Sequence, residues 1–483
     1  MPEGIKLHVV NLLSHNDPDV RRQAAEELTT SENNEAVGAL AAALWDESKG
    51  VRDAAVRALC QHDGGQVARA IVDLIRDENI MTRNLIAELL LKWGKSSIPA
   101  VMSYTQDPSC HVRKFSLDII GLIGTDEQLP DVLPLLDDPD QNVVLSAVEA
   151  LGNIGSADAI SHLIRTYDVQ EFGQTFIAEA LGKIGGSDAG DFLLLNLKIE
   201  LSKRSPDPLL LFALIEALGA CGSASALETL RENIGNVQGR LRHILLQSIV
   251  QIADRVHLPM LVPAEFKRDF VDAFIESDVS GKIASAKGLT EFIDIDVMRT
   301  LMQSFGIAEE LDAILIQILE TNDESFRVGV EVLQTTRPAG RTGRKEIIGL
   351  LGKLSSRFIV EYAQREAIPL SDTIFRRAFE IVAIEWGPAD EQSRAIILDV
   401  LFRLDGDRAV EFVGDVMNDP DRWVRIHVIE LLAAIDDRRA PDFIARFLND
   451  DDEMVREVAM TTLNAYSSAS HQLPPDPETS MNR

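Results

Sequence analysis

The chain has 483 residues, of which 46% are hydrophobic and 5% aromatic, and its formal net charge is −30 at pH 7. So acidic a chain lacks the cationic surface that displaces counterions from phosphates, which argues against DNA, RNA or an anionic membrane surface as a partner. The three cysteines have no CxxC spacing, and the sequence shows neither a signal peptide nor an uncharged apolar run of about 18 residues that could span a membrane. We therefore expect a cytoplasmic protein.

A short sequence unit recurs along the chain at a nearly constant interval. Its clearest copy, Asp138–Gly155, reads as a turn opened by Asp138-Pro139, one amphipathic helix, and an end marked by Gly152 and Gly155. The apolar position of Val143, here called the valine slot, is filled in other copies by Val20, Val51, Thr82, Val112, Ser393, Val424 and Val455, with neighbouring copies 30 or 31 residues apart. One hairpin of this length cannot bury its apolar face alone, so the period is typical of a stacked solenoid.

The chain divides into stretches of different regularity. Residues 1–255 alternate outer and inner helices, and the inner helices are expected to begin near Val20, Val51, Thr82, Val112, Val143, Gly173, Leu210 and Leu241. The stretch Phe192–Pro208 lengthens one repeat and is interpreted as an extended outer helix and loop. Residues 256–390 are expected to be divergent helical repeats, 391–466 regular repeats, and 467–483 a disordered tail.

The repeated pattern Asp-Pro-x-x-x-Val-Arg-x-x-Ala-x-x-x-Leu-Gly-x-Ile-Gly resembles the HEAT repeat. It looks most like the short bacterial variety first named from phycobilisome (bilin) lyases, and the best copies are Asp107–Gly124, Asp138–Gly155 and Asp419–Ile435. The resemblance covers residues 5–255 and 390–466 well. It implies an all-α fold, a right-handed superhelix of roughly a dozen helical hairpins. It implies little about activity, because scaffolds, lyases, hydroxylases and nucleic-acid enzymes all use this repeat.

Two charged columns accompany the valine slot. An aspartate stands five residues before the slot and an arginine directly after it in many copies. These residues are Asp46, Asp77, Asp107, Asp138 and Asp419, and Arg21, Arg52, Arg83, Arg113, Arg425 and Arg456. Stacked at the repeat spacing, they predict a ladder of ion pairs that fixes the register of neighbouring repeats. The alternative is a row that binds an anion or a partner.

A third column lies six residues after the slot, off the buried stripe, and is expected to line the concave side of the solenoid. It comprises Glu26, Arg57, Glu88, Asp118, Glu149, Glu179, Glu216, Gln247, Asp399 and Glu430. Phenylalanines accompany it in the middle copies. We predict an acidic groove with aromatic anchors that binds a basic protein segment through Glu88, Phe115, Asp118, Glu149, Phe176, Glu179, Phe212 and Glu216. The alternative is that these residues serve only repeat composition and helix packing.

Signals of catalysis are weak. The chain has no HExxH or GxSxG motif, and none of its nine histidines precedes a glutamate, whereas HEAT-repeat deoxyhypusine hydroxylases hold iron on His-Glu pairs. The basic segment Arg337–Lys345 is interpreted as an interhelix loop, with an anion site as the alternative. We predict no enzyme, cofactor or metal, but a scaffold or adaptor in a regulatory or signalling assembly. The alternative function is a bilin lyase or lyase subunit.

Overall fold

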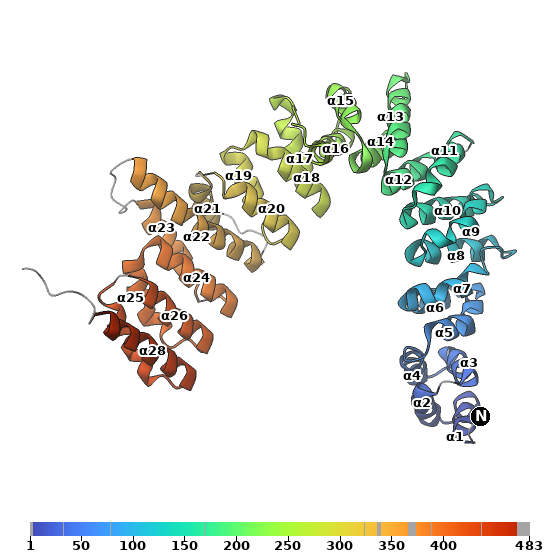
Figure 1. Cartoon of the computed structure of the whole chain (residues 1–483), viewed down its shortest axis with the longest axis horizontal. Coiled ribbons are helices and arrows are strands. Elements are labelled where there is room, and N and C mark those ends of the chain that lie inside the picture. Colours follow the sequence, from blue (N-terminus) through green and yellow to red (C-terminus); the bar gives the residue numbers. More distant parts are fainter. Residues whose placement is uncertain are drawn as a thin grey trace, which may run out of the picture. The chain divides into compact units, whose positions relative to one another are not determined.

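The computed structural model describes residues 3–470 apart from 32, 78, 170, 323, 336–339, 366–372, 388 and 436. Every regular element in these residues is helical (Figure 1). The chain forms two compact units, Met1–Leu261 and Val262–Arg483. The expected all-α solenoid is therefore confirmed, and the two units are described separately.

Unit 1 is a stack of helical hairpins. Its helices are α1 (Glu3–Ser14), α2 (Pro18–Glu27), α3 (Asn34–Ala42), α4 (Lys49–Leu59), α5 (Gly64–Ile71), α6 (Ile80–Trp93), α7 (Ile98–Met102), α8 (Cys110–Ile123), α9 (Leu129–Val132), α10 (Gln141–Ile154), α11 (Ile160–Val169), α12 (Gln174–Ile184), α13 (Ser187–Ser202), α14 (Pro208–Cys221), α15 (Ala224–Glu232) and α16 (Arg240–Val256). The even-numbered helices from α2 to α16 begin where inner helices were expected. The lengthened repeat consists of the long helix α13 and a short loop before α14, as predicted.

The inner helices α8, α10, α12, α14 and α16 pack on one another in succession. Glycine allows this close packing: a Cβ atom on Gly152 would lie 2.9 Å from the Cα atom of Ala180 on the next inner helix. Gly155, with φ of 77°, instead ends α10 in the left-handed conformation. We expected both glycines to end the helix, so that interpretation is wrong for Gly152, which lies inside α10 and sets the interhelix distance.

The turn before α10 also differs in detail from the expectation. The N-cap residue is Asp140, whose carboxylate accepts hydrogen bonds from the backbone amides of Asn142 and Val143. Asp138, which opens the turn, is not the cap: its carboxylate accepts the amide of Asp140 at 2.9 Å and binds Arg113 of the neighbouring repeat. Capping and inter-repeat pairing are thus divided between two aspartates.

An arginine–aspartate ladder links successive repeats. At four places within the described residues, the arginine after the slot pairs with the aspartate 25 residues later: Arg21 with Asp46 (2.7 Å), Arg113 with Asp138 (2.8 Å), Arg394 with Asp419 (3.0 Å) and Arg425 with Asp450 (2.8 Å). The pair is shielded from solvent, and the hydrogen bond from Arg21 holds the pKa of Asp46 below its usual range. Asp107 pairs with a different arginine, because its partner at 2.5 Å is Arg76, which does not follow a valine slot.

Three of these ladder arginines, Arg21, Arg113 and Arg425, also bind the turn before their own helix. The guanidinium of Arg113 donates to the carbonyl oxygen of Asp107 at 2.8 Å, and that of Arg425 donates to the carbonyl oxygen of Asp419 at 2.5 Å. One side chain therefore ties the turn of its own repeat to the turn of the next. The predicted stacking ladder is confirmed at the pairs of Arg21, Arg113, Arg394 and Arg425. It is wrong for Asp77, Arg52, Arg83 and Arg456, which form no ion pair within the described residues; Arg52 and Arg456 bind only backbone carbonyl oxygens.

Unit 2 repeats this plan with less regular lengths. Its helices are α17 (Lys267–Glu276), α18 (Val279–Leu289), α19 (Ile295–Met302), α20 (Glu309–Leu319), α21 (Glu324–Thr335), α22 (Gly340–Arg365), α23 (Thr373–Ile384), α24 (Glu391–Leu404), α25 (Gly406–Val416), α26 (Arg422–Ala434), α27 (Ala440–Arg446) and α28 (Glu453–Ser470). The sequence of residues 256–390 predicts amphipathic helices near 264–276, 282–292, 308–320, 324–335, 344–353 and 371–386, and therefore neither α19 nor the full length of α22. Helix α28 continues to Ser470, and the remainder of the expected tail lies outside the described residues.

Removing Arg113 should destabilise unit 1 strongly. Its side chain is 12% exposed and that of Asp138 is 5% exposed, so Arg113→Met leaves a buried carboxylate without its cation, at a cost of about 3–5 kcal/mol. The free energy of unfolding by urea, followed by circular dichroism, measures this loss.

The matched control is Arg165→Met. Arg165 pairs with Asp137, the residue beside Asp138, but these side chains are 57% and 73% exposed. An exposed pair contributes about 0–1 kcal/mol. Equal effects of the two substitutions would contradict a structural role for the ladder.

Candidate protein-contact row on the inner helices

The eight predicted contact residues, here called the inner-helix row, lie on α6, α8, α10, α12 and α14. All four glutamates of the row are exposed, and Asp118 is partly exposed. Phe176 and Phe212 are 46% and 37% exposed, while Phe115 is half-buried. The row therefore lies on the surface of the inner helices.

The predicted column does not extend to α16. Gln247 is only 6% exposed there. The next residue, Ser248, donates its hydroxyl to the carbonyl oxygen of Ile215 at 3.0 Å, so this part of α16 packs against α14. The expectation that Gln247 continues the exposed column is wrong.

Two adjacent hollows share Glu149. One is lined by Asp118, Glu149, Leu122, Asn153 and their neighbours on α8 and α10. The other is lined by Glu149, Phe176, Glu179, Ala180 and Lys183. The structure thus brings Asp118, Glu149, Phe176 and Glu179 together, whereas Glu88, Phe115, Phe212 and Glu216 line neither hollow.

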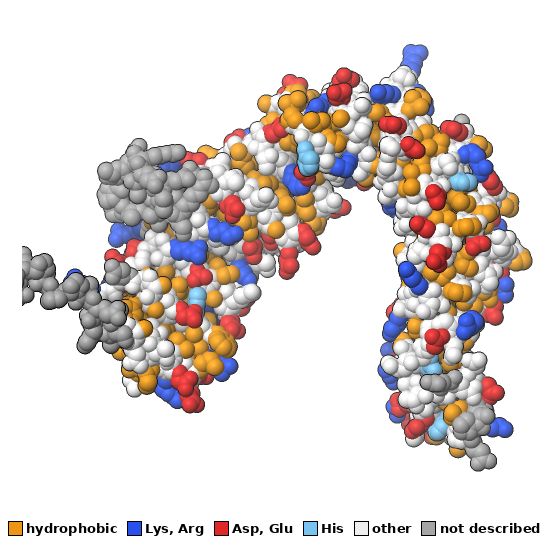
Figure 2. Space-filling view, viewed as in Figure 1, with side chains coloured by type: hydrophobic (Ala, Val, Ile, Leu, Met, Phe, Trp, Pro, Cys, Tyr) orange, Lys and Arg blue, Asp and Glu red, His pale blue; other side chains and the backbone are white. Residues whose placement is uncertain are grey.

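Lysines partly neutralise the row. Lys114 pairs with Asp118 at 2.7 Å, and Lys183 pairs with Glu179 at 2.8 Å. Figure 2 shows acidic and basic side chains interspersed along the face in view. These lysines were not among the predicted site residues, although each stands four residues from its carboxylate on the same helix, a spacing that favours an ion pair.

Glu149 differs from its neighbours because no ion pair holds its carboxylate in the described part of the chain. The corresponding positions four residues away on α10 are Leu145 and Asn153, and the amide oxygen of Asn153 accepts a hydrogen bond from Lys183 at 3.2 Å. An exposed carboxylate beside two hollows and the exposed ring of Phe176 can accept a cationic side chain of another molecule.

In unit 2 the same column contains Asp399 and Glu430, and a histidine lies between them. The Nε2 atom of His427 on α26 is 2.9 Å from the Oδ1 atom of Asp399 on α24, and its Nδ1 atom is 3.5 Å from Glu430. The hydrogen bond with Asp399 raises the pKa of His427, against the opposing effect of burial. Among the described residues, no group of three or more His, Cys, Asp or Glu side chains is placed to hold a metal ion.

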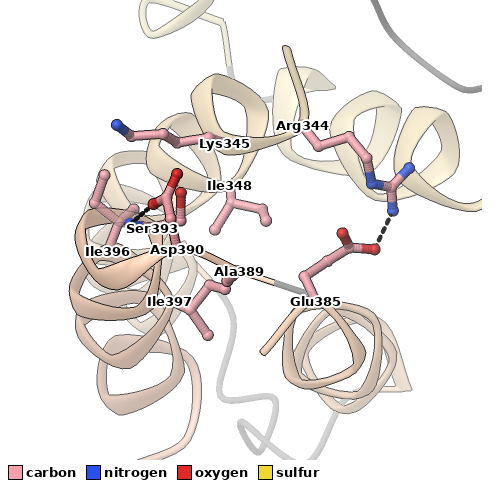
Figure 3. Close-up of a pocket in the computed structure, with 9 residues that line it drawn as sticks. All are labelled: Arg344, Lys345, Ile348, Glu385, Ala389, Asp390, Ser393, Ile396 and Ile397. Carbon is pink, nitrogen blue, oxygen red and sulfur yellow. Dashed lines mark hydrogen bonds and ion pairs between the residues drawn. The ribbon is translucent and has the colours of Figure 1, made fainter. Parts of the chain in front are cut away.

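The basic segment Arg337–Lys345 is not wholly a loop. Residues 337–339 lie outside the described part, but α22 begins at Gly340, so the interpretation as a loop is wrong for residues 340–345. Arg344 pairs with Glu385 at 2.5 Å, and both line a pocket shown in Figure 3.

Comparisons with known proteins identify the repeat. A family model described as HEAT repeats matches residues 7–91, 98–172 and 387–464. The match is to HEAT repeats in general, so the bilin-lyase-like subtype remains a prediction. No curated protein matches the sequence. Within the described residues, no helix is long and apolar enough to cross a membrane.

Two solved structures show how far the likeness extends. One is a chain from a structure of Kap95p with RanGDP; the alignment covers 97% of this chain and 72% of that chain, at 12% identity and a TM-score of 0.46. A structure of importin beta aligns with 95% of this chain and 77% of its own length, at 11% identity and a TM-score of 0.46. Likeness at this level carries no conclusion about partners.

The His427–Asp399 pair should make stability depend on pH. Because the folded-state pKa of His427 is raised above its ordinary value of 6.5, its contribution is fully present below that value and is lost as the pH rises through the folded-state pKa. We expect His427→Gln to destabilise the protein at about pH 5.5 and to have a smaller effect at about pH 9. Urea unfolding of both proteins at the two pH values measures this; a larger effect at the higher pH would contradict it.

Proposed function

Because the chain carries HEAT repeats in three regions, we propose that it is a non-catalytic scaffold or adaptor that binds another protein on the inner-helix row. The observation that carries the proposal is Glu149, an exposed carboxylate without an ion pair among the described residues, placed between two hollows and beside Phe176. A rigid stack of helices presents such a surface without ordering itself on binding, which keeps the entropic cost of association low.

The charged side chains around Glu149 lead to a narrower proposal for the charge pattern of the partner segment. A lysine or arginine of the partner would pair with Glu149, and an apolar side chain would cover Phe176. Lys114 and Lys183 flank this position and are only partly neutralised by exposed carboxylates. We therefore propose a partner segment with a basic residue at its centre and mixed charge around it, rather than the uniformly basic segment predicted from the sequence.

Two finer points belong to the same proposal. Cys60, Cys110 and Cys221 are all free thiols, which fits the reducing environment of the cytoplasm. A role in a regulatory or signalling assembly rests on analogy with other HEAT-repeat proteins. A bilin lyase remains the alternative from the repeat subtype, but we assign no residue to that reaction and do not propose it.

Reversing the charge of Glu149 should weaken partner capture. Glu149→Lys places a third cation beside Lys114 and Lys183, so a partner lysine or arginine would be repelled, and we expect a loss of about tenfold or more in captured partner. Affinity capture from native lysate with quantitative mass spectrometry measures the loss, and circular dichroism checks that the helices are intact.

The control is Asp191→Lys on the outer helix α13, where the side chain is also exposed. It makes the same change in net charge away from the row. Capture that is unaffected by Glu149→Lys, or reduced equally by Asp191→Lys, would contradict the proposed contact surface.

A further inference from the structure

Helices α26 and α28 of unit 2 each carry an exposed apolar side chain in their first turn. Trp423 is the second residue of α26 and Met454 is the second residue of α28, and they are 51% and 40% exposed. The same kind of cap holds both backbones: the amide of Trp423 donates to the carboxylate of Asp421 at 2.7 Å, and the amide of Met454 donates to that of Asp452 at 2.9 Å. Because α26 packs against α28, these equivalent positions are neighbours. We call Trp423 and Met454 the Trp–Met patch.

The fold does not require apolar side chains at these positions. The next residue in each helix, Val424 or Val455, occupies the valine slot and is buried, whereas the residue before it is exposed. Polar residues such as Asn142 and Gln392 occupy the equivalent position in other repeats, where they are also exposed. A lone exposed apolar residue is common on protein surfaces, whereas tryptophan and methionine together are typical of protein-contact surfaces. The Trp–Met patch is therefore a candidate docking surface.

Arg422 orients the indole ring of Trp423. The guanidinium carbon of Arg422 lies 5.1 Å from the centroid of the ring, and one of its nitrogens lies 3.7 Å from the carboxylate of Asp452. These contacts join the first turn of α26 to the turn before α28. A ring that is already oriented loses less conformational entropy when a partner covers its open face, so the patch is preorganised for binding.

Carboxylates at both ends of the patch are not balanced by cations. Glu391 lies in the first turn of α24, which packs on the other side of α26, and Asp451 and Glu453 flank the cap residue of α28. All three are exposed, and none of them has an ion pair within the described residues. The carboxyl group of Glu391 instead meets the carboxylate of Asp421 in a hydrogen bond, which raises the pKa of Glu391. The patch is thus an apolar surface with excess negative charge at each end.

We propose that the Trp–Met patch binds an amphipathic helix of another protein that carries large apolar side chains at its centre and lysine or arginine towards its ends. An apolar side chain of that helix would cover the open face of Trp423 and the flexible thioether of Met454. Packed helices lie about 10 Å apart, so basic side chains about two turns from the apolar centre would reach Glu391 at one end and Asp451 or Glu453 at the other. The proposal does not depend on the inner-helix row, whose residues all lie in unit 1.

Peptide binding to the full chain tests whether the partner must be an amphipathic helix. The probe is a fluorescein-labelled peptide of leucine and lysine, about 14 residues long, whose leucines form one face of a helix. Its control has the same composition, and therefore the same charge, but its leucines are spread around the helix. Fluorescence anisotropy should show saturable binding of the patterned peptide and an affinity about tenfold or more weaker for the control. Absence of binding by the patterned peptide, or equal affinity of the two peptides, would overturn the proposal.

Variants of two exposed tryptophans locate the site. Trp423→Gln introduces the residue type that position 392 carries in the preceding repeat, so the helix should form normally, and it should weaken peptide binding about tenfold or more. Trp45→Gln, which changes a 42% exposed tryptophan of unit 1, should leave the affinity unchanged. Circular dichroism checks that both variants are folded. Unchanged affinity in Trp423→Gln, or an equal loss in Trp45→Gln, would overturn the assignment to this patch.

Charge variants test the two ends of the patch. Glu391→Gln combined with Glu453→Gln should weaken peptide binding about threefold or more, because each carboxylate would pair with a basic side chain at the surface. Glu309→Gln combined with Glu310→Gln makes the same change in net charge at exposed positions of α20 and should have a much smaller effect. Equal losses in the two double variants would contradict a specific role for the carboxylates at the patch.

Two further outcomes would identify a different occupant or a different site. Self-association of the chain in sedimentation that Trp423→Gln abolishes would show that a second copy covers the patch, which would overturn the assignment to another protein. A loss of peptide affinity in Glu149→Lys but not in Trp423→Gln would place the peptide on the inner-helix row. That result would overturn the Trp–Met patch as a docking surface and leave the function proposed for the row intact.

Discussion

The arrangement of the repeats depends on the hydrogen bonds and the ion pair made by the arginine that follows the valine slot. A hydrophobic stripe alone would let neighbouring hairpins slide or rotate, because apolar contacts are not directional. The guanidinium group binds carbonyl oxygens of its own turn and the carboxylate of the next turn, as Arg113 does with Asp107 and Asp138. Since both partners are largely buried, a shifted register would leave charges unpaired at high cost. The ladder therefore selects one stacking of the hairpins.

This fixed register explains the candidate contact surface. Residues six positions after the slot occupy equivalent positions on successive inner helices. Asp118, Glu149 and Glu179 are therefore neighbours, although they are about 30 residues apart in sequence. Close packing of Gly121 against Ala150 and of Gly152 against Ala180 brings the three helices near enough for Glu149 to line two hollows.

Much of the fold was readable from the sequence because period, capping and core spacing agree with one another. The starts of the inner helices and the ladder follow from the positions of valine, aspartate and arginine. The length of α22 and the existence of α19 did not follow, because irregular spacing removes the reference frame that a period provides.

At the candidate site the column itself was predictable, whereas its electrostatics were only partly so. The pairing of Lys114 with Asp118 and of Lys183 with Glu179 could have been read from the helical spacing of four residues. The burial of Gln247 could not, since it depends on how α16 packs against α14. Nor could the pocket lined by Arg344, Glu385 and Ser393, which depends on how α22 packs against α24.

Photo-crosslinking tests most directly whether the inner-helix row contacts another protein. The photoreactive amino acid p-benzoylphenylalanine can replace Phe176 in the row or Leu195 on the outer helix α13, and both side chains are substantially exposed. If the row is the contact surface, irradiation in native lysate will join a discrete partner to the chain from position 176 and not from position 195. Equal crosslinking from both positions, or crosslinking from 195 alone, would contradict it.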